Sequence, residues 1–459
     1  MTLLTAFLEI TAPWRSVFPQ QRTFDRALRL ALGSLVCLGR RCLTRIIWTI
    51  GGQQRSWGAD YFLFSRCGWD PQQLFRPLLR EGLSYCSQRL IGVAIDDTRL
   101  RKTGRSIPQA FYQRDPMSPP FHVNLTFGLR FLQAVLLLPL HQRGEIDARA
   151  MPIRFEEVSR LKRPGRKATE QMKQDYRQAA KQHNLSRRFV AMGYQVRQEL
   201  DRAGAYDRIL VLAGDGSFCN RTCFAGVPER SELLVRARKH SKLCFRAPAG
   251  SRRVYAIDKF TPEQVRQDEQ RHWNSARIFY GGEQRDIRYK EVHEVLWQTG
   301  AQQRPLRLIV VAPTPYRKSK SKRLYYRDPA YLLTTDLSSP VQDLLQIYFD
   351  RWQIEVSHRE EKDTLGVGQA QLWNVTSVPK QPVLSVAAYS ALLLASLRAF
   401  GPDRGQAYAE LPRWRRNARR PSCLDLITRL RQEMDEQPES LSKLGLRVTK
   451  HAMVSAAAA

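Results

Sequence analysis

The spacing of apolar and polar positions divides the chain into three parts. Over residues 1–88, apolar side chains recur every three or four positions, as in FDRALRLALGSLVCLGRRCLTRIIWTI and PQQLFRPLLREGLSYC. This spacing is typical of amphipathic helices. From about residue 89, short apolar runs rich in branched side chains alternate with polar segments, which predicts strands. The region after residue 400 is polar and basic, so we expect a helical N-terminal part, an α/β centre and a basic C-terminal part.

The central elements follow an order that indicates a fold class. LIGVAIDD, FHVNLTFGLRF and LQAVLLLPL are three strand-like runs in close succession, and a long polar helix is predicted over about residues 168–200. DRILVLAGDG and SELLVRAR then supply two more strands, with a helical turn between them. Three strands, a helix, a strand, a turn and a strand are the element order of a ribonuclease-H-like core. We therefore predict an α/β fold with a ribonuclease-H-like mixed sheet flanked by helices.

Further strand-like pieces, RRVYAID, ARIFYGG, IRYKEVHEVLW and LRLIVVAP, interrupt this core. We interpret them as a β-rich insertion between the fifth strand and a later helix that carries Glu355. The predicted parts are a helical N-terminal DNA-binding region (1–88), the first part of the core (89–238), the insertion (239–327), the second part of the core (328–400) and a basic C-terminal region (401–459).

The charge balance of the chain indicates the kind of partner that it binds. The 459 residues include 74 Lys and Arg but only 43 Asp and Glu, which gives a net charge of +31. An excess of this size suits a long polyanion, so nucleic acid is the leading partner. Arginines recur along one N-terminal helical run, which favours DNA docking there: Arg22, Arg26, Arg29, Arg40, Arg41 and Arg45. A helical cap with a solvated basic face is the alternative interpretation of this region.

Several other classes fit the sequence poorly. The eight cysteines lack paired CxxC spacing and indicate reduced thiols. Cys219 and Cys223 have a spacing that could suit zinc, but no partner His or Cys pair is evident, which favours packing residues. The N-terminus lacks the basic start of a signal peptide. The apolar run 383–400 is short for a bilayer and contains Ser and Tyr, so it predicts a buried core helix. We expect a cytoplasmic protein with no membrane role.

Acidic side chains follow two of the predicted core strands. Asp96 comes after LIGVAI and Asp215 after LVLAG, so neighbouring strands would bring both carboxylates to one edge of the sheet. With Glu355 from a helix, they form an oxygen donor set that suits divalent cations. Two such ions, about 3.5–4 Å apart, can activate the attacking oxygen and stabilise the leaving oxygen of a phosphodiester. Turn formation or capping is the alternative for each Asp, and Asp97 is the alternative to Asp96.

The segment YFDRWQIEVSHREEKDTLG, residues 348–366, frames Glu355 with a phenol and two cations. On one helix, Tyr348, Arg351, Glu355 and Lys362 fall within a stripe about 60° wide. A solvated helix face with an Arg351–Glu355 pair, worth a few tenths of a kcal/mol, is the simpler interpretation.

This segment also matches a family signature. It resembles the Tyr-x2-Arg-x3-Glu-x6-Lys motif of DDE-class insertion-sequence transposases of the insertion-sequence-four superfamily at every defined position. IDDT at 95–98 is similar to the first aspartate block of that family and LAGDGSF at 212–218 to the second. YLLTTDL at 331–337 resembles the strand before the glutamate helix. The resemblance covers about residues 90–397.

The resemblance implies roles for individual residues. Asp96, Asp215 and Glu355 would be the catalytic triad and hold two Mg²⁺ ions, for which Mn²⁺ can substitute. Tyr348, Arg351 and Lys362 would contact the DNA, and Trp297 would stack on a base unless it is a core residue. Apart from the resemblance, Arg236, Arg238 and Lys239 follow the fifth predicted strand and could contact phosphates, with solvated surface charges as the alternative.

The resemblance also implies an activity. The protein would bind the terminal inverted repeats of its element, cleave each end by metal-dependent hydrolysis and join the freed 3′-OH ends to target DNA. Two ends and one target imply a homodimer assembled on double-stranded DNA, in a bacterial cytoplasm and at the nucleoid when bound. A metal-dependent nuclease or resolvase of the same fold and a domesticated, non-catalytic DNA-binding repressor are the alternatives.

Overall fold

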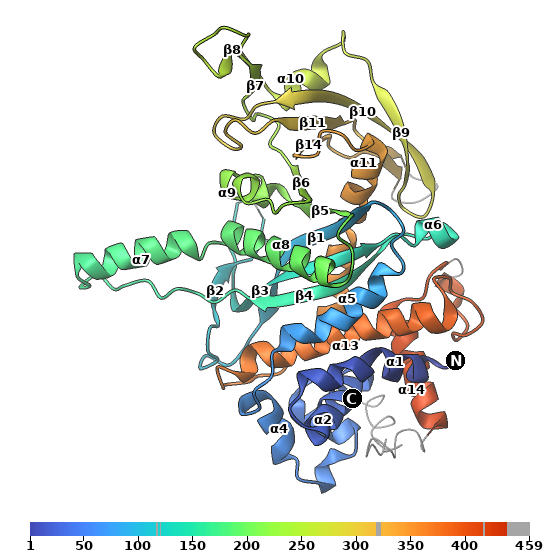
Figure 1. The fold of residues 1–459 in the computed structure, drawn as a ribbon. Coiled ribbons are helices and arrows are strands. Elements are labelled where there is room, and N and C mark those ends of the chain that lie inside the picture. Colours follow the sequence, from blue (N-terminus) through green and yellow to red (C-terminus); the bar gives the residue numbers. More distant parts are fainter. Residues whose placement is uncertain (116–117, 120, 318–322, 416–417, 438–459) are drawn as a thin grey trace.

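A mixed β-sheet forms the centre of the protein (Figure 1). The computed structural model describes residues 1–115, 118–119, 121–317, 323–415 and 418–437. Within them, ten strands form this sheet: β1 (Leu90–Arg101), β2 (Phe111–Arg114), β3 (Leu125–Leu138), β4 (Arg149–Glu157), β5 (Ile209–Gly214), β6 (Ser231–Arg236), β9 (Asn274–Phe279), β10 (Gln284–Val295), β11 (Leu306–Val311) and β14 (Ala330–Thr334).

The core of the sheet has the order β4-β3-β1-β5-β6. β3 runs antiparallel to both β4 and β1, whereas β5 runs parallel to β1 and β6. The strands β1 and β5 are apolar runs buried on both faces, as expected where helices cover a sheet on both sides. The predicted mixed sheet flanked by helices is confirmed and is consistent with a ribonuclease-H-like fold.

Two strand predictions next to β1 are wrong. FHVNLTFGLRF and LQAVLLLPL form one strand, β3, because the polar residues within it have partners in the fold. Arg130 pairs with Asp97 at 2.8 Å, and the amide of Gln133 donates to Glu361 at 2.6 Å. The third strand of this group is β4, which the pattern did not indicate. It contains Pro152, which the sheet accepts at an edge strand where the register shifts.

Helices cover both faces of the sheet. α8 (Leu185–Arg202) packs on one face, so closely that a Cβ at Gly193 would lie 2.8 Å from Leu212 Cδ1. The predicted helix 168–200 is divided into α7 (Glu170–Gln182) and α8, because the Asn184 side chain accepts from Arg187 N and caps a new helix. α7 has no buried residue and projects from the body of the protein (Figure 1).

The predicted insertion extends the same sheet. β14 pairs with β6, and β11, β10 and β9 follow it in order. The insertion also contains small elements: β7 (Leu243–Arg246), β8 (Tyr255–Phe260), β12 (Pro315–Arg317), β13 (Leu324–Tyr326) and α10 (Pro262–Gln267). The short helices α6 (His141–Gly144) and α9 (Arg221–Ala225) belong to the part of the chain before it. Residues 318–322 of the basic loop lie outside the described residues.

The N-terminal region is helical, as its spacing predicts. It contains α1 (Leu3–Thr11), α2 (Gln21–Val36), α3 (Leu43–Thr49), α4 (Gly58–Ser65) and α5 (Phe75–Leu83). These helices share one hydrophobic cluster with the sheet and with α13 (Ser377–Phe400). They therefore have the position of a helical cap, and their docking to DNA stays a prediction.

The apolar run 383–400 belongs to α13, which is long and apolar enough to cross a membrane. Most of this helix is buried inside the fold, where it packs against α1, α2, α5 and β4, so the predicted core helix is confirmed.

The basic C-terminal region is not confined to the surface, because α14 (Cys423–Glu436) enters the core. Cys423, Leu426, Ile427, Leu430 and Met434 of this helix are buried in the same core as α1 and α2. The carboxylate of Glu433, itself fully buried, accepts from Leu4 N at 2.7 Å. The C-terminal helix therefore closes the fold onto its N-terminus. Residues 438–459 lie outside the described residues.

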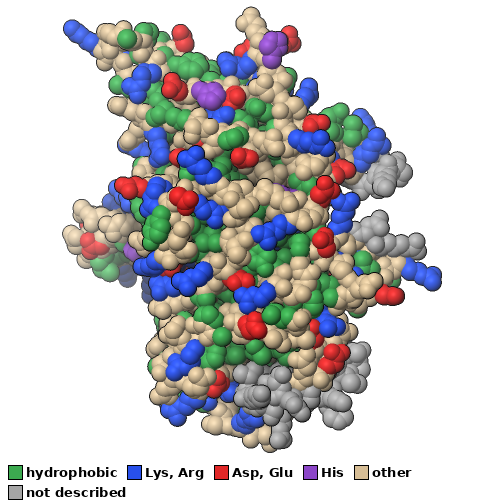
Figure 2. Space-filling view, turned by 45° about the vertical axis from the view of Figure 1, so that its right-hand side comes forward, with side chains coloured by type: hydrophobic (Ala, Val, Ile, Leu, Met, Phe, Trp, Pro, Cys, Tyr) green, Lys and Arg blue, Asp and Glu red, His purple; other side chains and the backbone are tan. Residues whose placement is uncertain are grey.

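The surface carries the excess of cations. Lys and Arg side chains are spread over the whole height of the face drawn in Figure 2, with Asp and Glu side chains between them. The basic character is therefore distributed over the body of the protein rather than confined to one tail.

Candidate active site

Asp96 and Asp215 lie side by side at the end of two parallel strands. β1 pairs with β5 in the register Leu90↔Ile209 to Ala94↔Ala213. Two residues further along each strand, the same register places Asp96 beside Asp215, which directly follows β5. The prediction that β1 ends at Asp96 is wrong, because β1 continues to Arg101 as the antiparallel partner of the longer β3. Asp96 nevertheless lies where the pairing with β5 stops, which leaves room for the two side chains.

The pleat of β1 separates Asp96 from Asp97. Successive side chains of a strand point to opposite faces. Asp96 shares the face of Ala94, which packs in the hydrophobic cluster of α11 (Val341–Asp350) and α12 (Gln353–Arg359). Asp97 lies on the other face and forms an ion pair with Arg130 at 2.8 Å. The geometry therefore favours Asp96 as the carboxylate of the candidate site.

Glu355 comes from α12, which follows α11 along this face of the sheet. α11 approaches β1 at Gly92, where an added Cβ would lie 3.2 Å from Ile347 Cγ1. The single helix predicted for residues 348–366 is divided into α11, α12 and a π-helical turn over Glu360–Thr364. Arg351 and Trp352, at the joint, keep right-handed helical backbone angles. Tyr348, Arg351 and Glu355 therefore remain on successive turns.

Asp215 repels both of the other carboxylates. Burial, then Asp215 and Asp97, raise the pKa of Asp96 to about 7, against the lowering effect of Arg351. Burial is also the main cause of the raised pKa of Glu355, to which Asp215 adds while Arg351 opposes it. Asp215 is therefore the common neighbour of the other two. Its own carboxylate accepts from Ser217 N at 2.9 Å, which fixes its orientation.

The carboxylates have not closed into a metal cage. In the part of the chain that the structure describes, no three His, Cys, Asp or Glu side chains are close enough to hold one ion. Arg351 instead pairs with Glu355, at 3.6 Å between Nη2 and Oε1. The simpler interpretation, an i,i+4 ion pair, is thus present in the fold together with the clustering of the carboxylates.

A phenol and two cations lie next to the carboxylates. Tyr348 is partly buried, which raises its pKa, and the nearby charges of Arg236 and Arg351 oppose this rise. Arg236 ends β6 beside the Asp215 loop, where its carbonyl oxygen is 3.4 Å from a Cβ placed on Gly216. The Nε of Arg351 is buried and has no hydrogen-bond partner among the described residues. Of the predicted DNA contacts, the structure brings Tyr348, Arg351 and Arg236 to the site.

The other predicted contacts lie elsewhere. Trp297 packs edge-on against Phe224, with ring centroids 5.9 Å apart, as in its core alternative. Arg238 is near Cys219, and the carbonyl of Lys239 accepts from Glu263 N at 3.2 Å.

Lys362 lies in the π-helical turn beside His358 and Glu361. Burial, and then Lys362, lower the pKa of His358 to about 3, so this imidazole is neutral.

One group of residues at the site was not predicted. Gln133 is the register partner of Asp96, and its side-chain amide donates to Glu361 Oε1 at 2.6 Å. Ser357 Oγ donates to the same oxygen at 2.9 Å. Burial raises the pKa of Glu361 to about 7. These contacts join β3, the strand beside Asp96, to the helix of Glu355. The only sign of them in the sequence was a lone Gln within an apolar strand.

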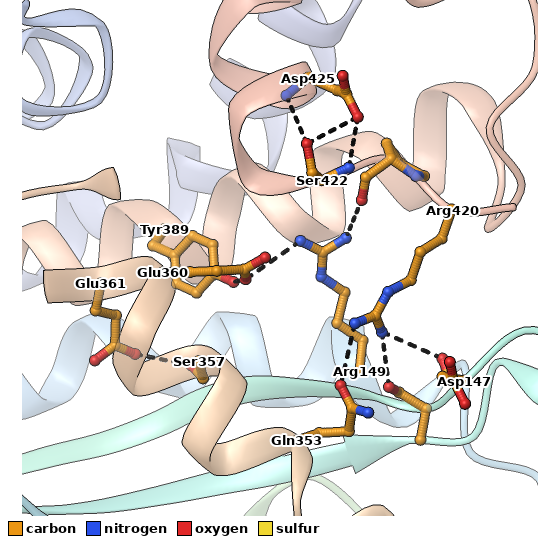
Figure 3. A network of polar contacts seen from close by, with 12 residues as sticks. Asp147, Arg149, Gln353, Ser357, Glu360, Glu361, Tyr389, Arg420, Ser422 and Asp425 are labelled. Carbon is orange, nitrogen blue, oxygen red and sulfur yellow. Dashed lines mark hydrogen bonds and ion pairs between the residues drawn. The ribbon is translucent and has the colours of Figure 1, made fainter. Parts of the chain in front are cut away.

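A second set of contacts holds the same helix from the C-terminal side (Figure 3). Arg149 of β4 lies 3.5 Å from Glu360, which also accepts from the hydroxyl of Tyr389. Arg420 donates to Gln353, two residues before Glu355, at 3.1 Å, and to the carbonyl of Ala148 at 2.9 Å. The consecutive carboxylates Glu360 and Glu361 therefore hold the end of α12 through different partners, Arg149 for the first and Gln133 for the second.

The crowding of Asp96 leads to a stability prediction. Asp96→Asn should stabilise the metal-free protein at about pH 8 by roughly 1–3 kcal/mol, as measured by urea unfolding in a chelator. The raised folded pKa means that ionisation penalises only the folded chain. The penalty is absent below about pH 4, grows as the pH rises, and is complete above about pH 7, so the gain should follow the same course.

Asp97→Asn is the matched control. It removes one charge that raises the pKa of Asp96 but also loses the ion pair with Arg130, so its gain at pH 8 should be much smaller than that of Asp96→Asn. An equal gain in both variants would contradict the placement of Asp96 among the repelling carboxylates.

Comparison with known proteins gives one family. No curated protein matches the chain. A family model described as DDE superfamily endonuclease matches residues 15–304. The matched range contains Asp96 and Asp215, and it ends before Glu355. Since it covers more than half of the 459 residues, the chain belongs to the DDE superfamily endonuclease family.

Proposed function

We propose that the protein is a cut-and-paste DNA transposase that uses Asp96, Asp215 and Glu355 as its catalytic carboxylates. It binds the terminal inverted repeats of its element as a homodimer, cleaves both ends and joins them to a target. Membership of the family makes DNA the substrate and places the chain among transposase-like nucleases. The motif in residues 348–362 supports the finer assignment to the insertion-sequence-four superfamily.

One observation carries the proposal. The parallel register of β1 and β5 brings Asp96 to Asp215, and the raised pKa of Glu355 has Asp215 among its causes. Three carboxylates from two strands and one helix thus share a single electrostatic site. Asp215 also caps the turn Gly216–Phe218, as in the capping alternative, but capping alone does not explain why it lies next to Asp96 and Glu355.

The donor set suits Mg²⁺, with Mn²⁺ as a substitute. Asp96, Asp215 and Glu355 offer only hard oxygen ligands, and their mutual repulsion is the state that a divalent cation relieves. When bound, two such ions supply the activation of the attacking oxygen and the stabilisation of the leaving oxygen. Glu355 would exchange its ion pair with Arg351 for the ions.

The neighbouring side chains bind the substrate. The unpartnered Nε of Arg351 and the guanidinium of Arg236 can donate to phosphate oxygens, which Arg recognises with its planar fork. The hydroxyl of Tyr348, protonated because burial raises its pKa, can donate to the same backbone. These groups hold the phosphodiester against the carboxylates, and the docked α12 keeps Glu355 in register with Asp96.

Joining of DNA tests the transposase against a nuclease. Pre-cleaved element ends with free 3′-OH groups, incubated with target plasmid and Mg²⁺, should yield joined products that are visible on a gel. A blocked 3′ end should abolish them, because the terminal oxygen is the nucleophile. Cleavage of intact ends without any joining, in Mg²⁺ and in Mn²⁺, would instead support a metal-dependent nuclease or resolvase, which the family description also accommodates.

A further inference from the structure

Aromatic rings line a groove near the C-terminal end of β1. α4 supplies Tyr61 and Phe62 on one side and is followed directly by Arg66, and residues 371–377 supply Leu372 and Trp373 on the other side. Its volume is about 420 Å³. The groove contains none of the catalytic carboxylates, and neither the predicted DNA contacts nor the active site include its residues.

The far wall of the groove is fixed to the strand that carries Asp96. Directly after β1, Lys102 Nζ donates to the carbonyls of Gly368 and Ala370, both at 2.6 Å. The side-chain oxygen of Gln371 accepts from Thr103 N at 3.2 Å and from Gly104 N at 3.3 Å. The segment that presents Trp373 is therefore held in place before any partner arrives.

Large rings in and beside the groove are open to solvent. Trp373 is 70% exposed, Phe62 is 44% exposed, and the neighbouring Trp57 is 57% exposed. Trp57 meets Tyr61 edge to face, with ring centroids 6.0 Å apart. The guanidinium of Arg66 lies 3.9 Å from the ring centroid of Phe62. Clustered exposed aromatic side chains of this kind mark a surface that binds a partner.

The charges around the groove indicate which kind of partner it binds. None of the described residues that line the groove is acidic. The one carboxylate of α4, Asp60, is buried and paired with Arg26 at 3.0 Å, while Arg40 lies near Lys102. A second copy of a chain with a net charge of +31 has few acidic groups to offer such a surface, whereas a polyanion has many. Planar rings beside a guanidinium instead suit a polyanion that itself carries flat rings.

We infer that the groove between α4 and residues 371–377 binds unpaired bases of a DNA strand, which stack on Trp373 and Phe62 while Arg66 neutralises a phosphate. In a duplex the faces of the bases are hidden, so only unpaired bases can reach these rings. The inference rests on the proposed function only in taking DNA as the polyanion. It adds a contact for single-stranded segments, at a distance from the cleavage site.

Binding of short oligonucleotides to the full-length protein tests this inference. A fluorescent thymidine oligonucleotide, measured by anisotropy in a chelator, should bind Trp373→Ala and Phe62→Ala each about 5- to 150-fold more weakly than the wild type. Trp373→Phe keeps a ring and should retain most of the affinity. Trp414, 89% exposed and outside the groove, provides the control Trp414→Ala, which should bind like the wild type.

Heparin distinguishes stacking from charge. The Ala variants should bind heparin as the wild type does, because heparin has no bases to stack. Equal losses for heparin and DNA, an equal loss in Trp414→Ala, or unchanged DNA binding in both groove variants would each overturn the inference. The binding assay contains no metal and involves no cleavage, so its result does not depend on whether the proposed catalytic function is correct. Conversely, unchanged binding in the groove variants would not count against Asp215 as a catalytic residue.

Discussion

Asp215→Asn is expected to reduce cleavage of element ends at least about 10³-fold, a loss of about 4 kcal/mol of transition-state stabilisation. Asp215 is the common neighbour of Asp96 and Glu355, so its removal takes away the carboxylate that both of the others share. Asn keeps the size and the hydrogen bond from Ser217 N, and the fold should be unchanged. Single-turnover cleavage of a labelled inverted-repeat duplex in Mg²⁺ measures the effect.

Asp207→Asn is the matched control for this variant. Asp207 is exposed and lies just before β5, whereas Asp215 lies just after the same strand. Asp207→Asn should therefore cleave at the wild-type rate. DNA binding by Asp215→Asn should not weaken, since a negative charge has been removed from a surface that binds a polyanion. Wild-type cleavage by Asp215→Asn would remove the proposed mechanism altogether.

Arg149→Met should cost about 3–5 kcal/mol of folding stability, the range for breaking one partner of a buried ion pair. Arg149 and Glu360 are both shielded from solvent and lie 3.5 Å apart (Figure 3). The change leaves Glu360 with the hydroxyl of Tyr389 but without its cation, and it also removes a hydrogen bond to the carbonyl of Pro421. Urea unfolding, followed by tryptophan fluorescence, measures the loss.

A second change to the pair separates burial from attraction. The double variant Arg149→Met with Glu360→Gln should recover part of the loss, because no unpaired charge then remains inside. Lys173→Met serves as the control, since Lys173 and Glu170 form a surface pair on α7 that should contribute less than about 1 kcal/mol. A loss in Arg149→Met no larger than in Lys173→Met would show that the buried contacts do not hold the helix of Glu355.

Local patterns were enough to predict the candidate carboxylates but not the residues that support them. Asp96, Asp215 and Glu355 were identified by strand ends and by one motif, which are properties of short segments. Gln133 and Glu361 escaped notice because they are 228 residues apart and meet only across the packed helix and sheet. A buried amide looks like any polar interruption until its partner is known, and for the same reason the long strand β3 was divided in two.

The sequence by itself determined which segments are amphipathic helices or buried strands, and it determined a charge that calls for a polyanion. Periodicity and composition act over a few residues, so they can be recognised without the fold. Only the tertiary structure decided that β1 and β5 align Asp96 with Asp215, that Asp97 points away, and that the C-terminal helix returns to the N-terminus. Those outcomes depend on strand register and long-range packing, where energies are shared between residues hundreds of positions apart.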